Sequence, residues 1–158
     1  MPEIERKFLV RELPPEAREG RAQEIEQGYL VAGPTEVRIR RSAGISQELT
    51  VKSGSGLRRV EVTLPLTSEQ FGELWPVVRC SLEKRRTTFA LGQWNVEVDV
   101  YAGKLDGLVV AEVEFGTEAE AHSFGPPAWF GAEVTGDDRF RNSALAAAEG
   151  PPEIILPA

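Results

Sequence analysis

The feature of this sequence that most constrains its fold is an alternation of charged and apolar residues, which is already present at residues 3–10. Successive side chains of a β-strand point to opposite faces, so Glu3, Glu5 and Lys7 share one face of this stretch. The opposite face is apolar apart from one arginine. Taken alone, the stretch is typical of the solvated face of an ordinary amphipathic strand. If the face is enclosed, its charges must instead be paired, hydrated or bound to a ligand.

The same alternation returns along most of the chain, in stretches separated by turn residues such as Gly33-Pro34 and Gly92-Gln93. We therefore predict strands over residues 3–10, 22–31, 36–41, 47–52, 59–64, 82–91, 94–101 and 108–115. In three other stretches the residues no longer alternate in the way a strand requires. These stretches predict short helices over residues 68–75, 117–124 and 142–149, with Ser68 and Thr117 as N-caps of the first two.

Length and composition limit the class of protein. The 158 residues fit one domain, predicted over residues 1–150, followed by a proline-containing tail over 151–158. The formal net charge of −7 predicts repulsion from nucleic acid and from anionic membranes, so neither is expected as a partner. Cys80 is the single cysteine, which excludes an intramolecular disulfide. The chain shows no signal-peptide pattern and no long apolar run, so the expected location is the cytoplasm.

The charged faces of the predicted strands carry nearly balanced numbers of cations and anions. An open sheet would show them to water, whereas a meander of about eight antiparallel strands can close into a barrel and turn one face inward. We predict an α+β fold that is mainly β, an eight-stranded antiparallel closed β-barrel whose apolar outer face is covered by the helices near residues 71–75 and from residue 142. The inward charges would be Lys7, Arg38, Arg40, Lys52, Arg59, Lys84 and Arg86, with Glu3, Glu5, Glu61, Glu97, Asp99, Glu112 and Glu114.

An inward face of this composition suits one kind of chemistry. Carboxylates without histidine or cysteine form an oxygen-only site, which suits Mg²⁺ or Mn²⁺ rather than structural zinc. Lysines and arginines beside it can bind a multiply charged anion, because guanidinium groups offer forked donors to phosphate oxygens. Divalent cations and a cationic cradle are what phosphoryl transfer requires, so the sequence predicts a polyphosphate substrate.

The first predicted strand also resembles a known motif. The run Glu3-Ile4-Glu5-Arg6-Lys7 is similar to the ExExK signature of the CYTH superfamily, the triphosphate tunnel metalloenzymes. The resemblance continues in order through Gln27-Gly28-Tyr29-Leu30, Val37-Arg38-Ile39-Arg40, Leu49-Thr50-Val51-Lys52, Glu83-Lys84-Arg85-Arg86, Glu97-Val98-Asp99 and Val110-Ala111-Glu112-Val113-Glu114-Phe115. Residues 133–142 resemble those of the small bacterial enzymes that hydrolyse inorganic triphosphate, which usually have a tyrosine where this chain has Phe140.

The resemblance implies an eight-stranded tunnel that binds triphosphate together with Mg²⁺ or Mn²⁺. By position, the implied metal ligands are Glu3, Glu5, Asp99, Glu112 and Glu114. The implied triphosphate cradle consists of Lys7, Arg38, Arg40, Lys52, Lys84 and Arg86, with Arg59 as a less sharp match. Our hypothesis gives catalytic roles to Glu5, Lys7 and Tyr29, where Tyr29 either orients the attacking water or is a wall residue of the tunnel.

The predicted function is metal-dependent hydrolysis of inorganic triphosphate to pyrophosphate and phosphate. The sequence leaves open an organic triphosphate substrate, as in a thiamine triphosphatase, an NTPase or a class IV-type adenylyl cyclase. It also leaves open a non-catalytic polyphosphate- or nucleotide-binding module, although binding an anion alone needs no such concentration of carboxylates, and a plain barrel with a solvated charged face. The oligomeric state is not fixed, and a homodimer is one option.

Overall fold

The computed structural model describes residues 4–54 and 60–154 of the chain. Within these residues one sheet contains the strands β1 (Ile4–Val10), β2 (Arg21–Val31), β3 (Thr35–Ser42), β4 (Ser46–Ser53), β5 (Val60–Pro65), β6 (Cys80–Leu91), β7 (Trp94–Tyr101), β8 (Val109–Phe115) and β9 (Phe130–Glu133). The helices are α1 (Pro15–Glu19), α2 (Ser68–Leu74), α3 (Glu118–Ser123) and α4 (Asn142–Ala147), with 3-10 turns η1 (Trp75–Val77), η2 (Gly103–Leu105) and η3 (Asp138–Phe140).

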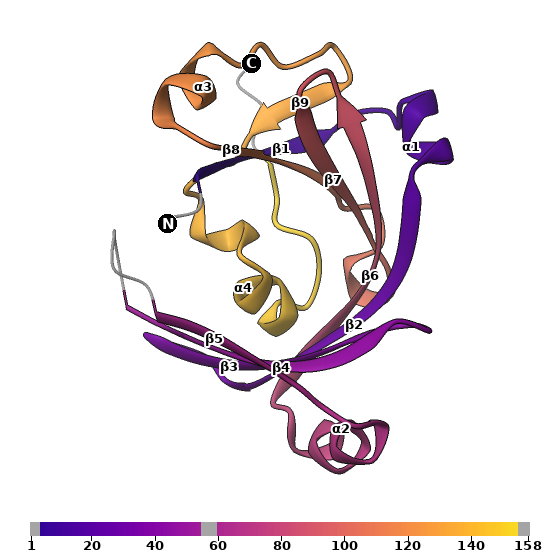
Figure 1. Cartoon of the computed structure of the whole chain (residues 1–158), viewed down its shortest axis with the longest axis vertical. Coiled ribbons are helices and arrows are strands. Elements are labelled where there is room, and N and C mark those ends of the chain that lie inside the picture. Colours follow the sequence, from indigo (N-terminus) through magenta and orange to yellow (C-terminus); the bar gives the residue numbers. More distant parts are fainter. Residues whose placement is uncertain (1–3, 55–59, 155–158) are drawn as a thin grey trace.

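The sheet is antiparallel throughout, with the order β5-β4-β3-β2-β6-β7-β8-β1-β9. It curls strongly, so that β3–β5 lie on the opposite side of the enclosed centre from β1, β8 and β9 (Figure 1). The predicted fold class, a mainly antiparallel β structure with a few helices, is confirmed. The pairings among the described residues leave β5 and β9 as the two edges.

The short strand β9 was not predicted from the sequence. It pairs with β1, and the backbone N–H of Val134 just beyond it donates to the carbonyl of Lys7 at 2.8 Å. Gly131 makes this approach feasible, because a Cβ there would lie 3.1 Å from the carbonyl oxygen of Leu9. The strand is too short for alternation to reveal it. With β9, the sheet contains nine strands within residues 4–54 and 60–154, one more than the predicted eight.

Two helices cover parts of the outer, apolar face of the sheet. Helix α3 contacts β1 and β8, and the adjoining Phe124 packs with Phe8, Phe115 and Phe130. The predicted N-cap Thr117 is confirmed, because its hydroxyl accepts from the backbone N–H of Glu120 at 3.1 Å. This face forms a continuous aromatic and aliphatic core.

Helix α2 covers β3 and β4 on the same outer side, as predicted, and buries Phe71 to 1% exposure. Its N-cap is Thr67 instead of the predicted Ser68, since Thr67 forms a reciprocal capping box with Gln70. The following η1 packs against β2 at Gly28, where a Cβ would lie 2.8 Å from the Val78 side chain.

Helix α4 does not cover the outer face, and this part of the prediction is wrong. It lies on the concave side of the sheet, where it contacts β2 and β6 (Figure 1). Leu145 and Ala146 are fully buried there in one cluster with Tyr29, Leu82 and Tyr101. The strands turn apolar residues inward at this end, so α4 fills the interior and leaves the remaining part for charged residues.

The chain after α4 has no regular secondary structure over residues 151–154, and residues 155–158 lie outside the described part. The backbone carbonyl of Glu153 accepts from Nη1 of Arg139 at 3.1 Å. The predicted boundary between domain and tail stays a prediction. Among the described helices, none has the length and hydropathy needed to cross a membrane.

Candidate functional site

A charged cavity of about 300 Å³ opens on the concave side of the sheet. Every strand from β1 to β8 and the start of α4 contribute to its lining. The alternation predicted this inward orientation of the charged face. The charged side chains in the lining are Lys7, Arg38, Arg40, Lys52, Arg86 and Arg141, with Glu5, Glu36, Glu61, Glu97, Glu112 and Glu114.

Strands β3 and β4 contribute a cationic wall, which we define as Arg38, Arg40 and Lys52. Nη2 of Arg38 donates to the hydroxyl of Thr50 at 3.5 Å. Nε of Arg38 has no hydrogen-bond partner and is the one buried side-chain nitrogen or oxygen in this state across residues 4–54 and 60–154. An unsatisfied buried donor is costly, so the Arg38 guanidinium is available to an anion in the cavity.

A chain of hydrogen bonds holds Arg40 in this wall. Its Nε donates to Oε1 of Gln27 at 2.9 Å, and Nε2 of Gln27 donates to the hydroxyl of Tyr29 at 2.7 Å. Burial raises the pKa of Tyr29. Burial, with repulsion from Arg38 and Arg86, lowers the pKa of Arg40 to about 10. Near neutral pH Tyr29 is therefore a neutral phenol and Arg40 is a cation.

Strands β1, β7 and β8 contribute an acidic wall, which we define as Glu5, Glu97, Glu112 and Glu114. The register places Glu5 opposite Glu114, and Glu97 opposite Glu112. Like charges directly opposite one another repel. Burial raises the pKa of Glu97, and the nearby Glu112 adds to the rise. Nζ of Lys7 lies 3.1 Å from Oε1 of Glu112, so one lysine offsets part of this negative charge.

A buried ionic cluster adjoins the cavity on β6 and β7. Asp99 accepts from Nζ of Lys84 at 2.9 Å and from Nε and Nη2 of Arg86 at 2.8 and 2.9 Å. Burial opposes ionisation of Asp99, but Lys84 and Arg86 outweigh it and hold its pKa well below the usual range. Burial lowers the pKa of Lys84 to about 8 against the attraction of Asp99. On its cavity side Arg86 also pairs with Glu97 at 2.5 Å.

The segment leading into α4 closes one side of the cavity. Arg141 lies 3.6 Å from Glu36, and Oδ1 of Asn142 accepts from the hydroxyl of Tyr101 at 2.7 Å. Nζ of Lys7 also donates to the carbonyl of residue 140, at 3.1 Å. This segment therefore contacts both sides of the cavity. It contacts Lys7, which pairs with Glu112 of the acidic wall, and Glu36, which lies on β3 beside the cationic wall.

The structure brings most of the predicted site residues together. Those that line the cavity are Glu5, Lys7, Tyr29, Arg38, Arg40, Lys52, Arg86, Glu112 and Glu114. Asp99 and Lys84 do not line it, because they bond each other behind Arg86. Glu3 and Arg59 lie outside the described residues.

Several lining residues were not among the predicted inward charges, namely Glu36, Asn95, Arg141, Asn142 and Ser143. Strand parity could have found two of them, because Glu36 shares a face with Arg38, and Asn95 shares a face with the predicted inward Glu97. Arg141 and its neighbours lie at a helix start, where parity says nothing.

The acidic wall fits a hard divalent cation in its donor chemistry, since every member offers carboxylate oxygens. The described residues nevertheless contain no group of three or more His, Cys, Asp or Glu side chains that could hold a metal ion. Two carboxylates of the wall are engaged by cations of the protein, Glu112 by Lys7 and Glu97 by Arg86. The wall therefore supplies suitable donors that are not gathered around a single point.

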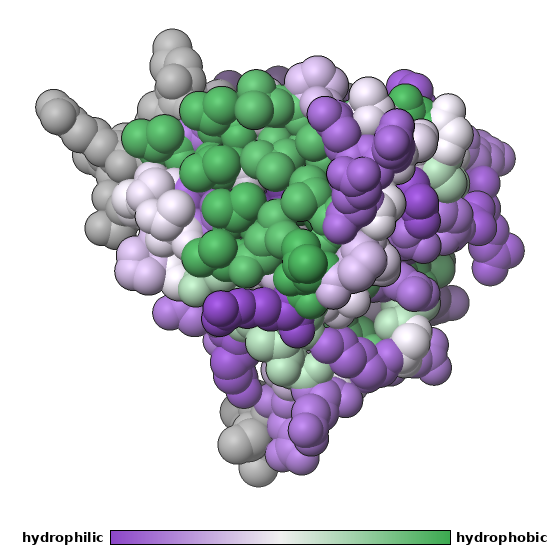
Figure 2. Space-filling view, turned by 90° about the horizontal axis from the view of Figure 1, so that it is seen from below, coloured by the Kyte–Doolittle hydropathy of each residue, from purple (hydrophilic) through white to green (hydrophobic). Residues whose placement is uncertain are grey.

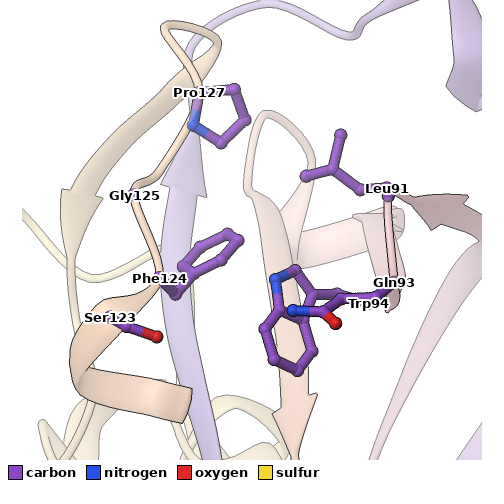
Figure 3. A pocket seen from close by; sticks show the side chains of 8 residues that line it. Leu91, Gln93, Trp94, Ser123, Phe124, Gly125 and Pro127 are labelled. Carbon is purple, nitrogen blue, oxygen red and sulfur yellow. The ribbon is translucent and has the colours of Figure 1, made fainter. Parts of the chain in front are cut away.

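A second hollow, of about 360 Å³, lies on the outside of the molecule between the β6–β7 turn and the segment after α3 (Figure 3). Its lining includes Leu91, Trp94, Phe124 and Pro127 and no charged side chain. Trp94 and Phe124 face each other across it in Figure 3. A polyphosphate would find no countercharge there, so the inner cavity is the candidate site.

Comparison with known proteins gives consistent matches over nearly the whole chain. The family model described as the CYTH domain matches residues 1–135. The inorganic triphosphatase of Nitrosomonas europaea is 42% identical over 149 residues, which cover 92% of this chain and 97% of the relative. The inorganic triphosphatase of Acetivibrio thermocellus is 34% identical over 151 residues, covering 90% and 92%.

The fold is also similar to solved structures. A crystal structure of an inorganic triphosphatase superposes with a TM-score of 0.77 at 39% sequence identity, and the alignment covers 94% of this chain and 96% of that one. The curled sheet is thus shared with a protein of known structure.

Proposed function

The chain belongs to the CYTH domain family, and from this membership we propose that it is a hydrolase that cleaves inorganic triphosphate into pyrophosphate and phosphate. Both relatives described above are named inorganic triphosphatases, and their similarity extends over at least 90% of this chain. The family model, which matches residues 1–135, spans all the strands that line the cavity. The activity named for the relatives supports the proposed reaction, and the charged cavity supports the proposed location of the active site.

The observation that carries the proposal is the meeting of two oppositely charged walls in one cavity, with an unsatisfied donor on the cationic side. Nε of Arg38 is buried without an acceptor. Arg40 and Lys52 stand on the same wall. A linear anion with several negative charges can satisfy these donors together, which a singly charged ligand cannot do.

We assign the phosphate chain to the cationic wall together with Arg86 and Lys7, which reach the cavity from the other strands. Arg141 is an additional candidate, because a phosphate oxygen could compete with Glu36 for its guanidinium at the cavity edge. Lys84 is proposed as a positioning residue that acts through Asp99 on Arg86. The role predicted for Arg59 stays a prediction.

We propose that Glu5, Glu112 and Glu114, with Glu97 beside them, hold Mg²⁺ or Mn²⁺ when substrate is bound. Oxygen-only ligation favours these ions over zinc. When bound, the ion would neutralise phosphate charge and lower the pKa of a water molecule. The carboxylates placed opposite each other on β1, β7 and β8 would repel one another less with a cation between them. The roles predicted for Glu3 and Asp99 stay predictions.

Lys7 is the chain's own candidate for assisting the leaving phosphate. Its Nζ is held between Glu112 and the carbonyl of residue 140, which keeps the ammonium at the junction of the two walls. Tyr29 is better placed as a positioning residue. Its hydroxyl accepts from Nε2 of Gln27, and Oε1 of the same side-chain amide accepts from Nε of Arg40. The raised pKa of Tyr29 makes it unsuited to act as a general base near neutral pH.

Inorganic triphosphate fits the cavity better than a nucleotide does. Tyr29 is the sole aromatic residue among the described lining residues, and it is only 2% exposed. A nucleobase needs an apolar or aromatic surface on which to stack. The remaining lining side chains are charged or polar, which suits a ligand made of phosphate groups alone.

The test is phosphate release from inorganic triphosphate, with ATP, thiamine triphosphate and pyrophosphate in parallel, in Mg²⁺, Mn²⁺ or a chelator. We expect metal-dependent release from triphosphate that is well above release from the other substrates. Preferential turnover of an organic triphosphate would reassign the substrate, and turnover that persists in chelator would remove the metal from the proposal.

A thermal shift assay, combined with the measurement of phosphate release, distinguishes a binding module without activity from an enzyme. Metal plus triphosphate should raise the melting temperature in either case, because any ligand that binds only the folded state stabilises it. A shift without phosphate release from any substrate would identify a binding module. No shift at saturating ligand would contradict an enclosed triphosphate site.

A further inference from the structure

The two sides of β3–β5 offer very different surfaces to a polyanion. The outer side, seen in Figure 2, is largely hydrophobic, with Val62 and Leu64 among its exposed side chains. The inner side is charged and polar, and α4 begins there with Asn142, which lines the cavity. The charged lining residues carry the proposed triphosphate site, and Asn142 adds a neutral amide to them.

Asn142 does not have the role that is most common for an asparagine at the start of a helix. Such an asparagine usually caps the helix, with its side-chain oxygen accepting from a backbone N–H. In α4 the N-cap is Arg141, which forms no side-chain cap hydrogen bond. The side-chain oxygen of Asn142 is instead bonded to the buried cluster on β6 and β7, so this cluster sets the orientation of the amide.

Two donors of the cluster fix which atom of the amide faces them. Oδ1 of Asn142 accepts from the hydroxyl of Tyr101 at 2.7 Å and from Nζ of Lys84 at 3.5 Å. A lysine ammonium has three N–H donors and no acceptor. The atom of Asn142 that faces Lys84 must therefore be the oxygen, and Nδ2 is left on the other branch of the amide.

The Nδ2 group of Asn142 is an accessible donor without an acceptor from the protein. Within residues 4–54 and 60–154, no group accepts a hydrogen bond from it. In the same part of the chain, the one buried side-chain nitrogen or oxygen without a partner is Nε of Arg38, so Nδ2 is not sealed from the cavity. The two donors on Oδ1 polarise the amide and strengthen its N–H groups as donors.

We propose that Asn142 is a further substrate-binding residue, which donates from Nδ2 to a phosphate oxygen; this inference rests on the proposed triphosphate site. A neutral amide supplies a donor to the anion without adding a positive charge beside Lys84 and Arg86. The neighbouring contacts place this donor at the junction of the two walls, because Lys7 donates to the carbonyl two residues before Asn142.

The proposal also gives the buried Lys84 a second route to the substrate. Lys84 is 1% exposed and does not line the cavity. Its Nζ donates both to Asp99 and to Asn142. The charge of Lys84 therefore supports Arg86 through the carboxylate of Asp99, and it supports the Asn142 amide through Oδ1.

Two substitutions separate substrate binding from a purely structural role of Asn142. Asn142→Asp keeps an oxygen acceptor for Lys84 and Tyr101 but has no N–H donor. Asn142→Leu has a similar size, adds no charge and removes both the acceptor and the donor. A purely structural role predicts a defect in Asn142→Leu alone, whereas substrate binding predicts that both variants lose affinity for triphosphate.

The experiment combines steady-state hydrolysis of inorganic triphosphate, urea unfolding and the melting shift caused by triphosphate. We expect KM to rise about 10-fold in Asn142→Leu and at least as much in Asn142→Asp, whose charge also repels phosphate, with kcat changing less than KM. Stability should fall in Asn142→Leu and be retained in Asn142→Asp, because a carboxylate still accepts from Lys84. The melting shift should be smaller than that of wild type in both variants.

Ser143→Asp is the matched control for charge. Ser143 is the next lining residue, and its substitution adds the same charge while the Asn142 amide is kept. We expect this charge alone to raise KM by no more than about threefold. A stable Asn142→Asp protein with the KM of wild type would overturn the proposal, and so would an equal rise in KM in Ser143→Asp.

Failure of the proposed function is a separate result. A wild-type chain that does not hydrolyse triphosphate contradicts the proposed function, and the melting shift alone then decides the role of Asn142. A shift in wild type that is reduced in both Asn142 variants would support the role. Equal shifts in all three proteins, or no shift in any of them, would overturn it.

Discussion

Each wall of the cavity holds like charges close together, but the neighbouring side chains that accommodate these charges differ between the two walls. On the cationic wall the guanidinium groups donate to neutral side chains, Arg38 to Thr50 and Arg40 to Gln27, and Arg40 also lies 4.0 Å from Glu48. On the acidic wall carboxylates are placed directly opposite each other, as in the pair Glu5 and Glu114. The cationic wall is thus held largely by hydrogen bonds to neutral side chains, whereas the acidic wall is offset in part by Arg86 on Glu97 and Lys7 on Glu112 and gains further from a bound cation.

This difference assigns separate energetic roles to the two walls. The cationic wall is preorganised, with Gln27 fully buried and fixed between Tyr29 and Arg40. Preorganised donors favour binding without further cost of ordering. The acidic wall gains most from a ligand that brings positive charge. Substitutions on the acidic wall should therefore affect turnover, and those on the cationic wall should affect substrate affinity.

The largest effect is expected from the acidic wall. Glu5→Gln keeps the side-chain size at an exposed position and removes one carboxylate charge, so we expect triphosphate turnover to fall by about 1000-fold with an unchanged melting temperature. Steady-state phosphate release in Mg²⁺ and Mn²⁺ measures this. The control is Glu118→Gln, on the exposed first turn of α3. Wild-type turnover in the Glu5 variant would contradict the metal assignment.

The next effect is on stability and comes from the cluster that supports Arg86. Asp99→Asn leaves Lys84 and Arg86 without their buried counter-charge, so we expect a loss of about 3 kcal/mol in the free energy of unfolding. Urea unfolding measures this loss, with the exposed Asp106→Asn as the control. A change no larger than that of the control would contradict the assigned role.

The pH dependence of stability checks the same cluster. The folded-state pKa of Asp99 is lowered, so its stabilising contribution is complete above the pKa of an unfolded aspartate, about 4, and is lost as the pH falls further. The wild type should therefore lose stability below this pH more steeply than Asp99→Asn does. Parallel acid unfolding curves for the two proteins would be inconsistent with this cause.

A smaller effect is expected on the cationic wall. Arg38→Met removes the unsatisfied donor, and we expect KM for triphosphate to rise roughly 10- to 100-fold, the value of one or two charge-assisted hydrogen bonds, with little change in kcat. The control is Arg85→Met on the same sheet, whose side chain is 61% exposed and pairs with Glu24. A fall in kcat at unchanged KM would place Arg38 in the chemical step instead.

The smallest effect separates the two roles considered for Tyr29. Tyr29→Phe removes the hydroxyl that accepts from Gln27, so we expect KM to rise only about threefold, with the pH profile of kcat unchanged. Tyr101→Phe, which loses a bond to Asn142 away from this wall, is the matched control. A large fall in kcat with an altered pH profile would show that Tyr29 is catalytic.

Strand parity made most of the candidate site predictable. Residues such as Arg38 and Arg40 were assigned to the interior because alternation is a local property of each strand, and the structure places both in the cavity. Parity does not report how far along a strand a residue lies from the open part of the interior. Lys84 and Asp99 have the correct parity but are enclosed beside Tyr101 and Asn142, so they pair with each other.

Elements without a strong period were predicted less well. Strand β9 spans Phe130–Glu133, which is too short to show alternation, and it forms because Gly131 permits close approach to β1. The helix from Asn142 was predicted, but its position was not. Its apolar side chains would suit either surface of the sheet, and the apolar inward residues at one end of β2 and β6 decide in favour of the interior.

The sequence by itself determined which side chains share a face, and therefore that carboxylates and cations would meet on one side of an antiparallel sheet, because the period of two is fixed by the backbone. Only the tertiary structure decided which of them form a wall, which neutralise each other in a buried cluster, and where α4 lies. These outcomes depend on the curl of the sheet, which brings together residues such as Glu36 and Arg141. No local pattern encodes that distance.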